Sequence, residues 1–429
     1  MNTNTHEYRP MFLFGSYTSP MPKVKDITKQ ILSGELEFGS NHRLQTNLGF
    51  EGVMDPHSAE LTKATLNAIT SVLSEQPSKN TKTPPNYEEL AQIVDDLCKN
   101  EGTHRTPTLI PFRNLVFEDL LKKLNASDSL KKYIGPIRDR SVSRWDILNA
   151  TNDWIRWNVY ESLIDRNKEH TNKVLLERNG EDIVNGQINF LRTLNCDKRL
   201  FSLSTLNHDI KSESALKTLG IHYEDGFYFD ESIQTSRFHP SKLNDNDQNI
   251  LLKLHGSIDW CWNGEEYHRL DNPDSDYSEG NHNLGYYGTP DFLAGILGKM
   301  EAYNYANYPW IWAKFQNQLL QTRRIICSGY GFMDLGVTNR LSGWLSYIDG
   351  AQILILDPDP ESLIEKCQSH SISNISSFFG CRETPLKYTI CEKSSEIENI
   401  EHPIILLKCG FEDASEHAEA LRKFAYFSS

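Results

Sequence analysis

Six short apolar runs, each bounded by turn-forming residues, constrain the fold of this chain most strongly. They are Phe12–Phe14, Leu200–Ser204, Ile250–Leu254, Ile325–Ser328, Ile353–Leu356 and Ile404–Leu407. Runs of this kind predict buried β-strands. Several lack the alternation of apolar and polar residues, which is typical of strands covered on both faces by helices. The pattern predicts an α/β fold with a doubly wound, mostly parallel Rossmann-like sheet.

A long stretch with helical periodicity separates the first predicted strand from the second. Asn86 and Glu89 predict a helix N-cap with its partner three residues on. Trp145, Trp154 and Trp157 belong to an aromatic-rich segment with helical spacing. Aromatic residues at this spacing usually pack inward, so we expect them in a core.

These patterns predict one domain over residues 1–429, with its sheet built from about 11–45 and about 195–410. A large helical insertion or lid is predicted over 46–190. The polar stretch Gln76–Asn86 predicts an exposed linker, and Asn263–Thr289 predicts a long surface loop.

Charge and cysteine usage narrow the class of protein. The net charge of −14 argues against a protein whose bulk surface binds nucleic acid. No apolar run is long enough to span a bilayer, and the N-terminal segment lacks the features of a signal peptide. The eight cysteines form no C-x-x-C pair, so neither a disulfide framework nor a zinc site is expected. We expect a soluble cytoplasmic protein without a metal.

Polar or glycine-containing turns follow five of the predicted strands, where ligands of doubly wound sheets bind. The first turn includes Gly15, Ser16 and Ser19 and leads into a predicted helix over Val24–Leu32. A helix N-terminus attracts phosphate, although an ordinary capped turn explains this segment equally simply.

The second and third turns carry the side chains best suited to chemistry. Asn207 and Asp209 lie two apart after the second strand, on one side of an extended chain. An Asx turn accounts for them as well as a ligand site does. His255 stands directly at a strand end and precedes Gly256, which suits a general base. A lone histidine is more often a structural hydrogen-bonding residue.

The last two turns add candidates for binding a nucleotide. Gly329 and Tyr330 follow the fourth strand, where a pair of glycines suits a flat or phosphate-bearing ligand. Asp357 ends the fifth strand, where an acidic side chain commonly bonds a ribose hydroxyl. Asp357 is alternatively the cap of the helix that starts near Pro360.

The order of these segments resembles the sirtuin-like family. The segments are GSYTSPMP, STLNHD, KLHGSIDW, CSGYGFMD and LDPDP, and the third and fourth are the most specific. They are similar to the prokaryotic sirtuin-like branch more than to the classical deacylases. The resemblance covers residues 11–22 and roughly 195–365. The chain departs from classical sirtuins in having only Cys261 near the zinc-module position, and Ser16 with Tyr17 where Gly-Ala-Gly is usual.

The resemblance implies a role for each of these residues. Asn207 would hold the ribose of NAD and the attacking water, and His255 would act as general base or ribose activator. Asp209 would contact the nicotinamide side. The remaining contacts to NAD would come from Gly15, Ser16 and Ser19 at the phosphates, Gly329 and Tyr330 at the adenosine half, and Asp357 at its ribose.

The function that the resemblance implies is NAD glycohydrolase activity, with NAD as a substrate cleaved to nicotinamide and ADP-ribose. It also implies a role in bacterial antiphage defence through NAD depletion. Control of such an enzyme implies a homo-oligomer and a separate sensor or ATPase, of the HerA-type ATPase or short Argonaute kind. Three alternatives stay open: a non-catalytic scaffold that binds NAD or ADP-ribose, a protein deacylase, and a purely structural subunit.

Overall fold

A parallel sheet of eight strands forms the centre of the molecule. The computed structural model describes residues 9–15, 24–33, 56–75, 86–101, 110–139, 143–163, 180–194, 196, 198–244, 247–262, 266–270, 290–293, 303–304, 306–369, 378–379 and 387–426. In spatial order the strands are β12 (Tyr388–Cys391), β13 (Ile404–Lys408), β11 (Gln352–Asp357), β10 (Arg324–Ser328), β1 (Met11–Phe14), β2 (Ser202–Thr205), β6 (Asn249–Lys253) and β3 (Tyr223–Glu224). All seven neighbouring pairs run parallel, which confirms the predicted α/β class and parallel sheet.

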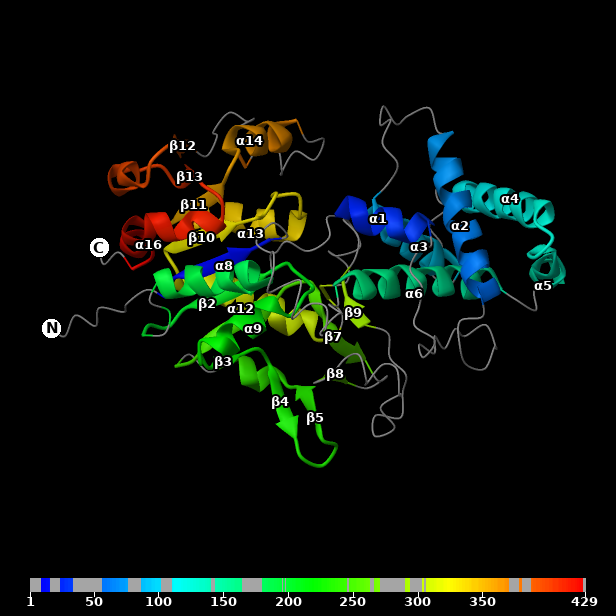
Figure 1. The fold of residues 1–429 in the computed structure, drawn as a ribbon, viewed down its shortest axis with the longest axis horizontal. Helices are drawn as coiled ribbons and strands as arrows, with labels where there is room; N and C mark the ends of the chain where they lie inside the picture. Colours follow the sequence, from blue (N-terminus) through cyan, green and yellow to red (C-terminus); the bar gives the residue numbers. More distant parts are fainter. Residues whose placement is uncertain are drawn as a thin grey trace.

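Both faces of this sheet are covered, which explains why its strands are apolar without alternation. Met11 and Leu13 of β1 point into one core, and Phe12 and Phe14 point into another. The first core is closed by α12 (Tyr308–Gln321), α13 (Leu335–Tyr347) and α14 (Pro360–Gln368). The second is closed by α8 (Gly180–Thr193), α9 (Lys211–Thr218), η7 (Glu412–His417) and α16 (Ala418–Ala425), with η6 (Ser394–Asn399) beside α16. Figure 1 shows these helices on the two sides of the strands.

A cluster of helices lies at the end of the molecule away from the C-terminus (Figure 1). Its members share one apolar core and are α1 (Val24–Ser33), α2 (Pro56–Ser74), α3 (Tyr87–Glu101), α4 (Ile110–Ala126), η3 (Lys131–Tyr133), α5 (Ile134–Asp139) and α6 (Arg144–Leu163). The predicted cap is present at the start of α3, where Asn86 and Glu89 exchange two hydrogen bonds of 3.0 Å. Trp154 is buried in this core, as expected, whereas Trp145 is 40% exposed.

The bounds of the predicted insertion, 46–190, do not coincide with those of this cluster. Helix α1 lies outside those bounds, yet Ile27 and Ile31 pack in the cluster core. Helix α8 begins inside them, yet Ile188 and Phe190 pack against the parallel sheet. The linker predicted at Gln76–Asn86 lies outside the described residues except for Asn86. The division into a domain and an insertion stays a prediction.

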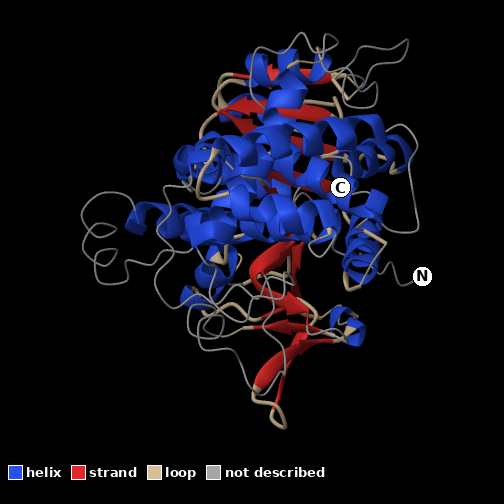
Figure 2. Ribbon diagram, turned by 90° about the vertical axis from the view of Figure 1, so that its right-hand side faces the viewer, coloured by secondary structure: helices blue, strands red, loops and turns tan. Residues whose placement is uncertain are grey.

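A second, antiparallel sheet was not expected from the sequence. Its spatial order is β4 (Phe227–Asp230), β5 (Thr235–Phe238), β8 (Tyr267–Arg269), β7 (Gly256–Trp262) and β9 (Pro290–Phe292), with η5 (Pro240–Leu243) following β5. Figure 2 shows these strands extending away from the helices that cover the first sheet. Ile258, Cys261 and Phe292 of this sheet belong to the core of the helical cluster, so the cluster packs on it.

The second sheet corrects two predictions. The segment after His255 is strand β7, not a loop at the edge of the first sheet. Strand β8 lies inside the segment Asn263–Thr289, where we expected only a loop. Strands β3 and β12 at the two edges of the first sheet were also not predicted. Among the described helices, none is both long enough and apolar enough to cross a membrane.

Candidate active site

Five strand ends, those of β1, β2, β6, β10 and β11, bring the predicted residues to one edge of the parallel sheet. Phe14 of β1 pairs with Thr205 of β2 and with Ser328 of β10, and Thr205 pairs with Lys253 of β6. Asn207 and His255 each stand two residues beyond the paired positions Thr205 and Lys253. The strand order reverses between β1 and β10, and ligands of open α/β sheets bind outside the strand ends at such a reversal.

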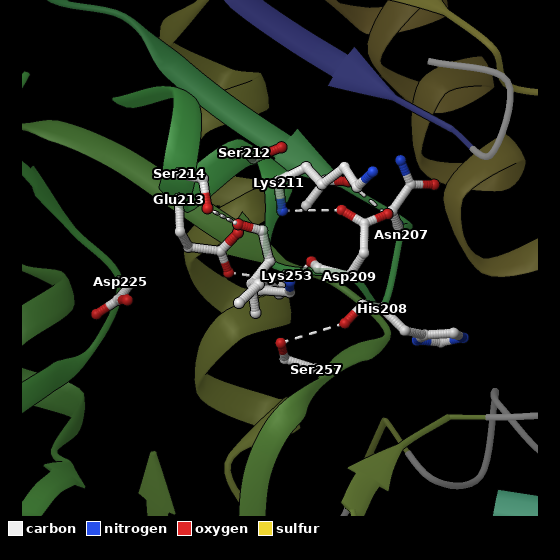
Figure 3. Close-up of polar contacts among 12 residues, drawn as sticks. Asn207, His208, Asp209, Lys211, Ser212, Glu213, Ser214, Asp225, Lys253 and Ser257 are labelled. Carbon is white, nitrogen blue, oxygen red and sulfur yellow. Dashed lines mark hydrogen bonds and ion pairs between the residues drawn. The ribbon is translucent and has the colours of Figure 1, made fainter. Parts of the chain in front are cut away.

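The segment after β2 is a buried turn that leads into α9. The backbone N–H of Asn207 donates to Oγ1 of Thr205 at 3.1 Å, and Asp209 Oδ1 accepts from the N–H of Lys211 at 2.9 Å. The second bond makes the Asx turn that the sequence allowed. Figure 3 shows the carboxylate of Asp209 turned toward Lys211, and the side chain of Asn207 directed away from Glu213. Asn207 and Asp209 are only 8% and 5% exposed.

His255 occupies the tight turn that joins β6 to β7. The next residue, Gly256, has φ +80°, which favours glycine. A Cβ there would lie 2.4 Å from the Tyr308 hydroxyl oxygen and 2.7 Å from the carbonyl oxygen of Asp291. The glycine therefore lets β9 and α12 approach the chain beside the imidazole. His255 is itself 4% exposed.

The imidazole of His255 contacts a carboxylate from another part of the sheet edge. Its Nε2 atom lies 2.9 Å from Oδ2 of Asp334. The hydroxyl of Tyr303 lies 3.0 Å from the same oxygen, and its ring is nearly parallel to the imidazole. Asp334 is fixed because its Oδ1 accepts the N–H of Val337 and caps α13. This arrangement suits an imidazole that takes up a proton, since the carboxylate stabilises the imidazolium.

Two groups beside this contact, Tyr303 and Arg340, have shifted pKa values. Burial, and then the negative charge of Asp334, raise the pKa of Tyr303, so its phenol stays protonated and donates a hydrogen bond. Burial lowers the pKa of Arg340, while Tyr303 and Asp334 act in the opposite direction. Arg340 stacks over Trp312, whose ring centroid is 4.0 Å from that of Tyr303.

Asp334 and Tyr303 were not among the residues predicted from the sequence. Asp334 directly precedes a helix, where an aspartate is an ordinary N-cap, and it is one here. A second signal was available, because Asp334 ends the segment CSGYGFMD that carried the resemblance. Tyr303 has no comparable local signal.

Gly15 and Gly329 meet at the reversal of strand order. A Cβ on Gly15 would lie 2.2 Å from the carbonyl oxygen of Gly329, and the N–H of Gly15 bonds to the carbonyl of Ser328 at 2.9 Å. The two strand ends therefore contact each other through backbone alone. Ser16 and Ser19, the other predicted phosphate contacts, lie outside the described residues.

Tyr330 and Asp357 have identifiable structural partners. The Tyr330 hydroxyl donates to the carbonyl of Asp334 at 2.9 Å, and its ring packs against Phe332 in the core. Asp357 ends β11, where its Oδ1 accepts from the N–H of Asp359 at 2.7 Å. The cap of α14 is Asp359, so Asp357 is not that cap. Burial raises the pKa of Asp357, and the bond from Asp359 opposes this.

A second histidine and a buried ion pair complete the site. The His208 ring lies 6.2 Å from that of His255 and 4.6 Å from that of Phe292, measured between centroids. Nζ of Lys253 lies 2.9 Å from Oε1 of Glu213. In the described part of the chain, no group of three or more His, Cys, Asp or Glu side chains is arranged to hold a metal ion.

Comparison with known proteins adds no assignment to this geometry. No protein-family model matches the chain. No curated protein matches it significantly.

Proposed function

We propose that this chain hydrolyses NAD to nicotinamide and ADP-ribose, with Asn207 and His255 as the catalytic residues. The observation that carries the proposal is the buried contact of 2.9 Å between His255 Nε2 and Asp334 Oδ2. A histidine placed at a strand end and paired with a carboxylate is the arrangement expected of a general base. The resemblance of the strand-end segments to sirtuin-like proteins supports NAD as the substrate.

The chemistry requires little beyond orientation and one proton acceptor. The bond between the nicotinamide nitrogen and the ribose carbon breaks, and the electron pair of that bond leaves the nicotinamide neutral. Positive charge develops on the ribose, and water adds its oxygen to the same carbon. The water loses one proton, so the products are nicotinamide, ADP-ribose and a proton.

Each catalytic residue has a role that fits its position. The side-chain amide of Asn207 can hold the attacking water or a ribose hydroxyl, because it both donates and accepts hydrogen bonds. His255 can take the proton from that water or hydroxyl. Asp334 then stabilises the resulting imidazolium, and the Tyr303 hydroxyl holds the carboxylate in place.

The end of β1 is the proposed location of the phosphates of NAD, and the end of β10, with Gly329 and Tyr330, is the proposed location of its adenosine half. Gly15 and Gly329 leave the backbone without side chains at the reversal of strand order. Asp357 ends the next strand, β11, and is the proposed partner of a ribose hydroxyl. Ser16 and Ser19 stay part of the proposal as phosphate contacts.

The proposed biological role is that of a cytoplasmic effector in antiphage defence, where depletion of NAD stops the infected cell. Unregulated cleavage of NAD would harm the cell that makes the enzyme. We therefore propose that the chain works as a homo-oligomer together with a separate sensor or ATPase.

A nicotinamide-release assay tests the function. Purified chain is incubated with NAD, alone and with the products of the flanking genes, and compared with Asn207→Ala and His255→Ala. Exposed residues of the same types provide the matched controls Asn244→Ala and His222→Ala. We expect both site variants to lose nicotinamide release by a factor of about 100 or more and both controls to keep it.

Two results would contradict the proposal. One is intact NAD under every partner condition, including phage-infected cells. The other is cleavage that the site variants retain at the wild-type rate. Calorimetric binding of NAD or ADP-ribose without any turnover would instead identify a scaffold subunit.

A further inference from the structure

The loop that carries Asn207 is held by atoms of the neighbouring strands. The ammonium of Lys253 donates a hydrogen bond to the backbone carbonyl of Asp209. The carbonyl of His208 accepts from the N–H of Ile258 at 2.9 Å and from Oγ of Ser257 at 3.3 Å. Figure 3 shows Lys253 between Asp209 and Glu213, with Ser257 below His208. The carbonyl of His208 thus accepts hydrogen bonds from β7, and the carbonyl of Asp209 accepts one from β6.

Lys253 is unusually placed for a lysine. It ends β6, two residues before His255, and it is 3% exposed. Lysines are almost never fully buried unless they are paired. Its partner is Glu213 in the first turn of α9, whose Oε1 is 2.9 Å from Nζ. A buried ion pair often contributes little to stability compared with apolar residues of similar volume, so stability alone does not account for it.

The position of Lys253 connects the two strand ends of the site. Its own backbone leads into His255, whereas its side chain bonds the loop that begins at Asn207. The same side chain therefore fixes the distance between the loop after β2 and the turn after β6. A displacement of about 1 Å in such a site can lower a rate about 100-fold.

We propose that Lys253 is a positioning residue, which holds the Asn207 loop in register with His255 while Glu213 holds Lys253 in place. This inference rests on the proposed function for its effect on catalysis. Its structural part is independent of NAD cleavage, because it concerns how firmly residues 206–210 are held.

Replacement of the pair by apolar residues separates positioning from stability. Lys253→Met alone leaves the buried carboxyl of Glu213 without the ammonium that it contacts, so we expect this variant to unfold at a lower urea concentration. The double variant Lys253→Met/Glu213→Leu removes both charges, and we expect it to recover that loss. Neither variant can bond the Asp209 carbonyl. Lys217→Met is the control, because Lys217 is exposed and lies on α9, as Glu213 does.

The test combines steady-state kinetics with amide hydrogen exchange. For the double variant we expect kcat to fall about 10- to 100-fold with the KM for NAD nearly unchanged. We also expect faster exchange at residues 206–210 and unchanged exchange in β1 and β10. A double variant that is stable and has wild-type kcat and wild-type exchange would overturn the inference. If the wild-type chain releases no nicotinamide but the double variant exchanges faster at 206–210, the proposed function fails and the positioning role stands.

Discussion

Nε2 of His255 lies 2.9 Å from Oδ2 of Asp334, and the two residues come from different strand ends of the sheet. Both side chains are at most 8% exposed. Oδ1 of Asp334 is occupied by the N–H of Val337. Oδ1 of the carboxylate thus caps α13, and Oδ2 contacts the imidazole of His255.

Because the two oxygens have different partners, the variant Asp334→Asn tests the negative charge of Asp334 separately from its role as the N-cap of α13. Asparagine is as good an N-cap as aspartate, so we expect stability to change by less than about 1 kcal/mol. Without the negative charge the imidazolium is less well stabilised, and we expect kcat for nicotinamide release to fall about 100-fold or more. Kinetics and urea unfolding of the same preparation check both parts. Asp349→Asn, at an exposed position, should leave both quantities unchanged.

A second prediction concerns the contact between Gly15 and Gly329. In Gly15→Ala the new Cβ would meet backbone atoms of Gly329 at 2.2 and 2.6 Å, which a side-chain rotation cannot relieve. We expect a loss of about 2 to 3 kcal/mol in the free energy of unfolding. Gly331→Ala is the matched control, since a Cβ there has nothing within 4 Å. Equal stability of the two variants would show that the strand ends separate easily.

The helical cluster and the second sheet are joined by an ion pair that permits a third prediction. Arg156 of α6 lies 3.0 Å from Asp291 of β9, and both side chains are largely buried. Burial acts to lower the pKa of Arg156, but the charge and hydrogen bond of Asp291, together with Asp153 and Tyr308, raise it overall. We expect Arg156→Met to cost about 2 kcal/mol because it leaves the aspartate without its cation. A double-mutant cycle with Asp291→Asn measures the coupling, and additive effects would contradict it.

Glu213 gives a prediction about pH. Burial raises its pKa from 4.5 to about 7, with Lys253 acting against the rise and Asp259 adding to it. Asp225, Arg269 and Tyr223 are the charged and titratable groups around them. Between the two pKa values the folded chain holds a proton that the unfolded chain has lost. The stability from this group is therefore present below about pH 4.5 and is lost as the pH rises through about 7.

The measurement for Glu213 is the free energy of unfolding as a function of pH. Glutamine cannot titrate, so we expect the free energy of unfolding of Glu213→Gln to fall less steeply than that of the wild type from about pH 5 to about pH 8. The comparison uses the slopes and not the absolute stabilities, because glutamine also changes the partner of Lys253. Parallel curves for the two proteins would contradict the assigned direction of the pKa shift.

The parallel sheet was predictable because burial on both faces imposes a strong local pattern. Strands such as Gln352–Asp357 and Ile404–Lys408 must be apolar at every inner position, and the sequence shows this directly. The antiparallel sheet carries no such pattern. Strand β7 mixes Ser257, Ile258 and Asp259, all buried, so a polar residue there does not indicate the surface.

The candidate site was predictable only in part, for a related reason. Asn207 and His255 stand directly after apolar strands, so their neighbourhood follows from the topology. Asp334 reaches His255 through the path of the loop after β10, and a local pattern does not encode that path. Lys253 follows three apolar, buried residues of β6, and a charge at such a position is a signal for a partner such as Glu213.

The central position of β1 has a consequence for biosynthesis. Met11–Phe14 is the first of the described strands along the chain, but its partners β2 and β10 begin only at Ser202 and Arg324. Contacts between residues so distant along the chain form slowly, and strand edges that are still unpaired favour aggregation. During translation β1 therefore lacks its partner β2 until Ser202–Thr205 is made and its partner β10 until Arg324–Ser328 is made, so the centre of the parallel sheet forms late.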